Sequence, residues 1–352
     1  AFLAIMSWTT GSTGRCEDCS TFVGLNFLWE PDFSSLSNPK IWLAAAGQIF
    51  FTLSVGMGTI HCYSSYLSQR DDIALNAMSA GWMNGFVEIV LGSAVVIPIA
   101  VGYLGLDWVV DNAGFMMAFK TMPFLFDQWG SVMAVISGVA WFGLLFFAGI
   151  TSSLAMGTPW MGFVQDEFGW TKKKSAFLLG IAIFVMGLPT ILFFEKGVFD
   201  EYDYWTGTVS LVIFALAEVI LFAWIFGMDK GWKEITDGAD MRIPRIYRPI
   251  IKYVTPLFIG IIFLTSLFKP LNGELSDWST AFSSLTSGQG WPWANDSIIN
   301  QIFHINTGVQ WMADGALTNM FYIDMSRFFL LACFFGLVAM VKIASNKRKK
   351  AA

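Results

Sequence analysis

Long apolar segments dominate this sequence and set the strongest limit on its fold. A bilayer core requires about 20 helical apolar residues. Segments of that scale occur at roughly 41–66, 79–104, 131–164, 175–194, 204–227, 248–268 and 327–345. Only 13% of the 352 residues are charged, against roughly 25% in soluble domains. The sequence therefore predicts an all-α polytopic membrane protein with seven complete spans, and the apolar run 1–8 has the composition of the end of another.

Basic residues cluster in alternate loops between these segments. The richer loops carry Arg70; Lys172, Lys173 and Lys174; Lys230, Lys233, Arg242, Arg245 and Arg248; and Lys347, Arg348, Lys349 and Lys350. Because cytoplasmic loops are enriched in Lys and Arg, we expect a cytoplasmic C-terminal tail in a plasma or inner cell membrane. The net charge of -5 gives no indication of a nucleic-acid partner.

Signals for catalysis are sparse in this chain. Cys16 and Cys19 form a CxxC, which alone is weak evidence for metal or redox chemistry. A short-range disulfide and two free thiols both remain open for this pair. The two histidines, His61 and His304, lie far apart in the sequence. Since no phosphate loop, nucleotide fingerprint or nucleophile elbow occurs, we do not expect an enzyme.

Polar residues inside the spans mark the first candidate site. The sequence AGQIFFTLSVGMG places Gln48, Thr52 and Ser54 beside Gly56 and Gly58. Two glycines in mid-span weaken a helix, and a break would expose main-chain groups to a ligand or an ion. Alternatively, the small residues let helices pack closely. The pattern alone favours neither interpretation.

Two carboxylates also lie within predicted spans. Glu88 shares a helix face with Asn84, one turn earlier. An ionisable group at that depth indicates function, although a protonated Glu hydrogen-bonded to a neighbouring helix is the alternative. Glu218 stands in the apolar run LVIFALAEVILFAW, where it could be a structural carboxyl or part of a proton route.

Adjacent hydroxyl groups form a further candidate site at Thr151, Ser152 and Ser153. Such groups in membrane helices usually bond to their own backbone, and the sequence favours that role. Beside a free carbonyl, the same oxygens would also suit Na⁺, a hard cation.

These segments, taken in order, resemble the neurotransmitter:sodium symporter family. The motifs are GLNFLW at 24–29, AGQIFFTLSVGMG at 46–58, EIVLGS at 88–93, FFAGITSSLAM at 146–156, DYWTGT at 203–208 and PRIYRP at 244–249. The resemblance covers nearly the whole chain and is closest to bacterial amino-acid symporters with the leucine-transporter fold.

The resemblance implies a division of the chain. Residues 1–40 would be the end of a truncated span and an external loop, and 41–227 the second five-helix inverted repeat, discontinuous near 54–58. Residues 228–352 would hold a cytoplasmic loop, two further spans, the external loop 269–326 and the basic tail. About the first five spans would be missing from this chain, and the same or a separate chain would supply them.

The resemblance also implies binding roles. Substrate-binding roles fall on Phe51, Thr52, Ser54, Met57, Ser152 and Met156, with Phe51 as the lid over the bound amino acid. Since Met57 stands where many members have an aromatic, a hydrophobic or neutral substrate is expected. Two sodium sites are implied, one using Thr52 and Asn84 and the other using the Ala148 carbonyl, Thr151 and Ser152.

Anion and gating roles carry over in the same way. Gln48 and Glu88 fall around the family's chloride position, where a fixed carboxylate would replace chloride and make transport chloride-independent. Gate positions fall on Tyr66, Phe115, Asp166 and Asp203.

The function implied is sodium-coupled amino-acid symport by alternating access. The alternative is a non-transporting membrane module for binding or assembly, which would require a partner half.

Overall fold

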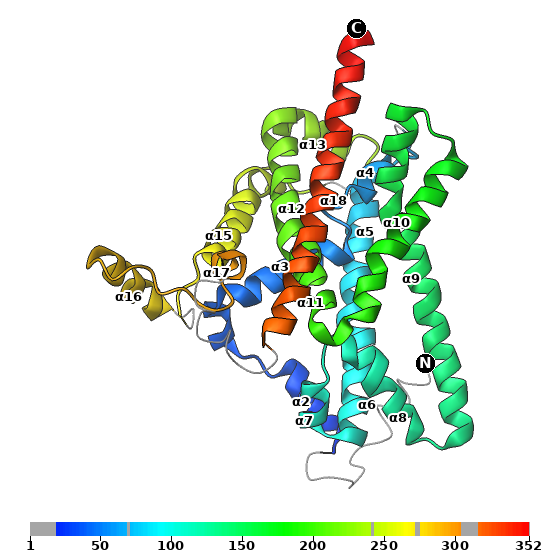
Figure 1. Cartoon of the computed structure of the whole chain (residues 1–352), viewed down its shortest axis with the longest axis vertical. Coiled ribbons are helices and arrows are strands. Elements are labelled where there is room, and N and C mark those ends of the chain that lie inside the picture. The colour runs from blue at the N-terminus through cyan, green and yellow to red at the C-terminus, as the bar shows by residue number, and fades with distance from the viewer. Residues whose placement is uncertain (1–18, 69–70, 241–242, 272–274, 304–315, 352) are drawn as a thin grey trace. The chain divides into compact units, whose positions relative to one another are not determined.

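The computed structural model describes residues 19–68, 71–240, 243–271, 275–303 and 316–351. The apolar run 1–8, Cys16, Arg70, Arg242 and His304 therefore lie outside the described residues. The regular elements are helices, which confirms the all-α prediction (Figure 1). Two compact units divide the chain. Unit 1 is Ala1–Asp32 with Leu75–Leu154, and unit 2 is Phe33–Ala74 with Ala155–Ala352.

In unit 1, short helices pack on the C-terminal part of one long helix, Ile73–Leu104. Its elements are α2 (Thr21–Trp29), most of α5 (Ile73–Gly85), the π-helical η2 (Phe86–Ser93), α6 (Ala94–Leu104), α7 (Leu106–Asp111), η3 (Met117–Thr121), α8 (Met122–Asp127) and the first part of α9 (Ser131–Phe168). Ile99, Met122 and Leu125 are fully buried at its centre. A Cβ added to Gly24 would lie 2.7 Å from the Pro98 Cα, so this glycine lets α2 approach α6 closely. Cys19, just before α2, is disulfide-bonded.

Unit 2 contains the remaining helices. They are η1 (Phe33–Ser37), α3 (Pro39–Thr52), α4 (Thr59–Ser64), the rest of α9, α10 (Lys172–Leu192), η4 (Phe194–Lys196), α11 (Val198–Tyr202), η5 (Asp203–Val209), α12 (Ser210–Ile220), η6 (Leu221–Gly227), α13 (Met228–Thr236), α14 (Tyr247–Pro249), η7 (Ile250–Val254), α15 (Thr255–Leu267), α16 (Leu275–Thr286), α17 (Ile298–Phe303) and α18 (Ala316–Ala351). A buried cluster that includes Leu43, Val212 and Ile259 joins α3, α12 and α15.

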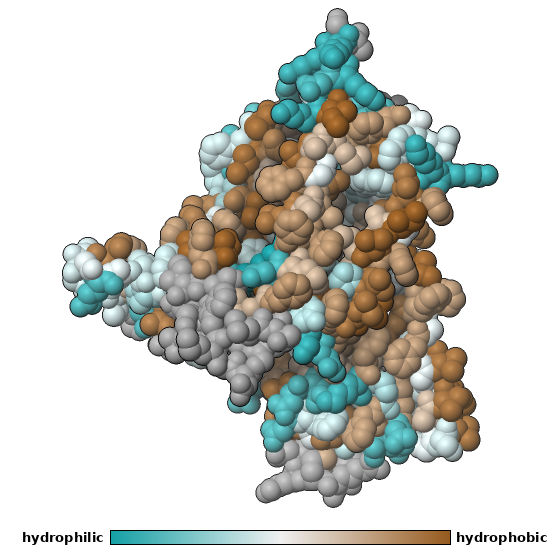
Figure 2. Space-filling model, in the orientation of Figure 1, coloured by the Kyte–Doolittle hydropathy of each residue, from teal (hydrophilic) through white to brown (hydrophobic). Residues whose placement is uncertain are grey.

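In the part of the chain that the structure describes, six helices are long and apolar enough to span a membrane. They are Ile73–Leu104, Ser131–Phe168, Lys172–Leu192, Val198–Thr236, Tyr247–Leu267 and Met320–Lys350. Hydrophobic side chains cover much of the visible surface, and hydrophilic ones gather at the C-terminal end of α18 (Figure 2). The chain is a multi-pass membrane protein.

The remaining predicted span, 41–66, is not a continuous helix. It divides into α3 and α4, because the backbone leaves the helical conformation between them. The break lies where the sequence predicts one. An inverted repeat need not coincide with a compact unit. The two compact units therefore do not test the predicted repeat boundaries at 41 and 227, which stay a prediction.

Candidate substrate and ion site

The break between α3 and α4 is set by three backbone positions. The φ angles of Ser54, Gly56 and Gly58 are 55°, 80° and 74°. Glycine adopts such angles without steric cost, whereas Ser54 adopts one that side chains disfavour. Glycine at two of the three positions therefore reduces the backbone strain of this interruption. The interruption ends α3 at Thr52.

Gly56 packs directly against α12. Its N–H donates to the Glu218 Oε2 over 3.1 Å. A Cβ at Gly56 would lie 3.0 Å from the Leu211 carbonyl oxygen and 3.2 Å from the Ala215 nitrogen. The break is therefore held both by a hydrogen bond to the Glu218 side chain and by close contact with another helix's backbone.

Glu218 also reaches the second half-helix. Its Oε1 lies 3.7 Å from the His61 Nδ1 on α4. The sequence left two roles open for Glu218, and these contacts favour the structural one, since a single carboxylate touches the break and α4. Sequence reasoning missed His61 as a site residue, although an ionisable side chain within a predicted span was an available signal.

Four of the predicted substrate residues lie at this break. Phe51 and Thr52 form the last turn of α3, and Ser54 and Met57 lie in the break itself. The Phe51 ring is exposed within the chain.

Two further predicted residues in unit 2 lie outside the break. Gln48 is exposed on α3, one turn before Thr52. Met156 is exposed on α9. Its place in the substrate pocket stays a prediction.

The predicted second sodium site lies on α9 in unit 1. The Thr151 Oγ1 donates to the Phe147 and Ala148 carbonyl oxygens, both over 3.0 Å. Backbone bonding of this kind is what the sequence favours for these hydroxyls. It also places the Thr151 hydroxyl beside the Ala148 carbonyl, two of the three predicted oxygen ligands. The third, Ser152, is exposed on the same helix.

Asn84 and Glu88 lie where α5 passes into the π-helical segment η2. The Ser93 hydroxyl donates to the Glu88 carbonyl oxygen over 3.0 Å, within this segment. Such π-helical turns are frequent at functional sites. Thr52 and Gln48 belong to unit 2 and these two residues to unit 1, so the shared sodium and chloride positions stay predictions.

The predicted gate residues lie on several elements. Asp203 begins η5, where its Oδ1 would lie 2.9 Å from a Cβ added to Gly207. Phe115 stacks on Phe119 with ring centroids 4.5 Å apart. Asp166 and Tyr66 are exposed. Their gating roles stay predictions.

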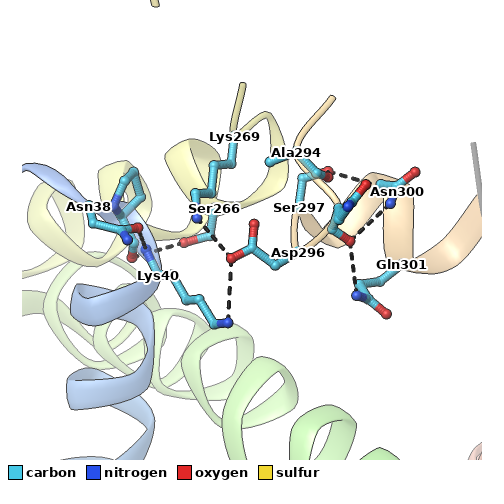
Figure 3. Close-up of polar contacts among 11 residues, drawn as sticks. Asn38, Lys40, Ser266, Lys269, Ala294, Asp296, Ser297, Asn300 and Gln301 are labelled. Atoms are coloured by element: carbon cyan, nitrogen blue, oxygen red, sulfur yellow. Dashed lines mark hydrogen bonds and ion pairs between the residues drawn. The ribbon is translucent and has the colours of Figure 1, made fainter. Parts of the chain in front are cut away.

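An ion cluster at the start of α3 was not predicted from the sequence. Asp296 accepts a hydrogen bond from the Lys269 Nζ over 2.8 Å and pairs with the Lys40 Nζ over 3.4 Å (Figure 3). Lys269 is 4% exposed, so the Asp296 carboxylate balances a buried charge. The Asn38 side chain caps the same end of α3 by accepting from the Lys40 N–H. The first turn of α3 is therefore fixed to the loop that contains Asp296.

Lys269 and Lys40 also affect how Asp296 titrates. Burial alone would raise the pKa of the Asp296 carboxyl, but the hydrogen bond and charge of Lys269 and the charge of Lys40 bring that pKa below its ordinary value. The carboxylate is therefore ionised at neutral pH. No sequence pattern relates these residues, because they come from separate loops and helix ends.

A membrane helix that is broken in mid-span and supported by a neighbouring span is typical of ion-coupled secondary transporters. The model of the sodium:neurotransmitter symporter family matches residues 20–307. The chain belongs to this family. Membership confirms the resemblance seen in the sequence and places the chain among transporters rather than enzymes.

Individual relatives agree with the family match. An uncharacterized sodium-dependent transporter of Haemophilus influenzae is 29% identical over 257 residues, which cover 70% of this chain and 54% of the relative. Another, of Methanocaldococcus jannaschii, is 30% identical over 250 residues, 68% of this chain and 50% of the relative. The sodium-dependent nutrient amino acid transporter 1 of Drosophila grimshawi is 26% identical over 287 residues, 77% and 45%. The chain spans about half the length of these curated relatives.

Proposed function

We propose that this chain is part of a sodium-coupled symporter for a hydrophobic or neutral amino acid. The observation that carries the proposal is the break between α3 and α4. It supplies non-helical main-chain groups beside Phe51, Ser54 and Met57. Membership of the symporter family supports ion coupling. The name of the Drosophila grimshawi relative supports an amino acid as the substrate.

The proposed roles follow the family resemblance. The amino acid lies against Phe51, Thr52, Ser54, Met57, Ser152 and Met156. One Na⁺ uses Thr52 and Asn84, and the second uses the Ala148 carbonyl, Thr151 and Ser152. Binding of Na⁺ and substrate favours the conformation in which both are held, and release on the other side follows from lower affinity in the alternate conformation.

Glu88 is proposed to make transport independent of chloride, because its carboxylate supplies the negative charge beside the first Na⁺. We predict that Glu88→Ser makes uptake chloride-dependent, and the check is uptake measured in chloride and in gluconate. An E88S protein that transports equally in both media contradicts this role, while Glu88→Asp is the matched control that keeps the charge.

The proposed activity requires more helices than the region shared with the relatives, which is about half of their length. We propose that about five further spans, in the same or a separate chain, complete the site in a plasma or inner membrane, with the basic tail on the cytoplasmic side. We call this assembly the completed protein. A non-transporting binding module with a partner half is the second candidate, favoured by the same difference in length.

Sodium-dependent uptake into proteoliposomes tests the proposal. Labelled leucine, alanine and glutamate are presented to this chain alone and to the completed protein, with Na⁺ or K⁺ outside. Uptake of leucine or alanine by the completed protein in Na⁺ only is the expected result. Binding without uptake by the completed protein supports the second candidate, and the absence of both removes the amino acid as substrate.

A further inference from the structure

A cavity of about 430 Å³ lies in unit 2 where two membrane-length helices end. It is lined by residues from the end of the helix Val198–Thr236 and from the start of the helix Tyr247–Leu267. A phospholipid headgroup is expected at such a level, since it is the boundary between hydrocarbon and water.

The local backbone creates this cavity. Gly227 has φ of 99°, which breaks the helical path and turns α13 away from η6. A Cβ at Gly231 would meet the Phe222 ring at 2.5 Å, so α13 folds back closely on η6. Figure 1 shows α13 at the end of the α12 helix.

α13 is amphipathic in the manner of an interfacial helix. Met228 and Gly231 are buried and Trp232 is half-buried, whereas Lys233 and Glu234 on the opposite face are exposed. Helices of this kind lie in the plane of a membrane surface. The cavity is therefore bordered by an element suited to the headgroup region.

Aromatic side chains form one wall of the cavity. The Trp224 and Tyr253 ring centroids are 6.0 Å apart, and the Trp224 Nε1 donates to the Lys252 carbonyl oxygen over 2.8 Å. Both rings are more than half exposed within the chain. Exposed Trp and Tyr side chains are enriched at membrane interfaces because their rings are amphipathic.

The charge of the cavity is net positive. Its one acidic lining residue, Asp229, forms an ion pair with Arg248. Lys230 and Lys252 line the cavity as well, and within the described ranges neither forms an ion pair. The Lys252 Nζ lies over the Tyr253 ring, 5.4 Å from its centroid. Two lysines therefore remain available to an anion.

We propose that this cavity binds the headgroup of an anionic phospholipid. The phosphate pairs with Lys230 and Lys252, and the glycerol and upper acyl chain lie along Trp224 and Tyr253. A free phosphate would use the lysines but not the exposed aromatic wall, and a zwitterionic lipid would bring a second, positive charge toward them. Juxtamembrane lysines attract anionic lipids for the same electrostatic reason.

Native mass spectrometry of the full chain tests this site. The detergent-solubilised protein is mixed with equal amounts of phosphatidylglycerol and phosphatidylcholine, and retained lipid is counted. We expect wild type to prefer phosphatidylglycerol. Lys230→Gln with Lys252→Gln should lower its retention about 25-fold, at about fivefold per lysine. The matched control, Lys347→Gln with Lys349→Gln, removes the same charge from the tail and should keep the preference.

Three outcomes overturn the proposal. They are equal retention of both lipids by wild type, unchanged preference in K230Q/K252Q, and displacement of the lipid by millimolar inorganic phosphate. A second measurement needs no variant. Phosphatidylglycerol with a photoreactive diazirine in its headgroup should label peptides containing 223–230 and 252–253 of the wild-type chain. Labelling confined to other peptides also rejects this site.

Discussion

The break at Gly56 and the hydroxyl cluster at Thr151 are both candidate binding sites, but different contacts define them. Gly56 is held by a carboxylate and a backbone from α12, far away in the sequence. The Thr151 hydroxyl donates to two carbonyls of its own helix, and it is exposed. The first site therefore depends on tertiary packing, and the second on one helix turn.

Because of this difference, substitutions at the two sites should distinguish effects on folding from effects on ligand binding. Substitutions at the break should change the stability of unit 2 as well as transport, because they disturb contacts between helices. Substitutions at Thr151 should leave folding almost unchanged, because the helix does not need that hydroxyl, and should weaken Na⁺ binding only if the proposed ligand role is correct. Unfolding and uptake measured on the same variants therefore test whether the two sites differ in this way.

Gly56→Ala should give the largest effect. The new Cβ would be strained at φ of 80° and would press on the Leu211 carbonyl oxygen. We expect a loss of about 2 kcal/mol or more in unfolding free energy, together with loss of uptake by the completed protein. Thermal unfolding in detergent measures the first effect and labelled uptake the second.

Gly143→Ala is the matched control for this change. It stands in α9 with nothing within 4 Å of an added Cβ. We expect it to be neutral or to stabilise the helix by up to about 1 kcal/mol. Equal behaviour of the two alanine variants would contradict the assignment of Gly56 to a packed break.

Glu218→Ala should have the next largest effect. It removes the acceptor of the Gly56 N–H and the partner of His61. Leaving a buried donor without its acceptor costs about 1–3 kcal/mol, and we expect a loss of that order in the unfolding free energy. Glu218→Gln keeps an oxygen acceptor and should lose much less. If E218Q and E218A are equally unstable, the charge matters rather than the hydrogen bond.

The Asp296 cluster gives a smaller effect that depends on pH. Because its pKa in the folded protein lies below the ordinary value, the carboxylate stabilises the fold at neutral pH. That stability persists down to the unfolded-state pKa, about 3.9, and is lost as pH falls through the folded-state pKa. Asp296→Asn should remove this part of the acid dependence, as measured by unfolding from neutral pH to well below the unfolded-state pKa of about 3.9. An unchanged pH profile would contradict the contribution of this cluster.

The sequence predicted those features that depend on local pattern. Apolar length identified the spans, and the paired glycines at 56 and 58 indicated where one of them breaks. The contacts between distant segments were not predictable from the sequence. Glu218, for example, is compatible with a structural or a proton-carrying role, and only its hydrogen bond with Gly56 favours the structural one. Asp296 and Lys269 gave no signal either, since loop residues show no periodicity that relates them.

The smallest effect on folding should come from Thr151→Val, which keeps the shape of the side chain and removes the hydroxyl. The hydroxyl bonds to carbonyls that already belong to α9, so we expect unfolding to change by less than about 0.5 kcal/mol. If Thr151 is a Na⁺ ligand, half-saturation by Na⁺ in uptake by the completed protein should rise roughly tenfold, equivalent to about 1.4 kcal/mol. Thr151→Ser, which keeps the oxygen, should restore it. Unchanged sodium dependence in T151V would leave the hydroxyl with its backbone role only, whereas a loss of stability as large as in E218A would show that α9 depends on tertiary contacts at this turn.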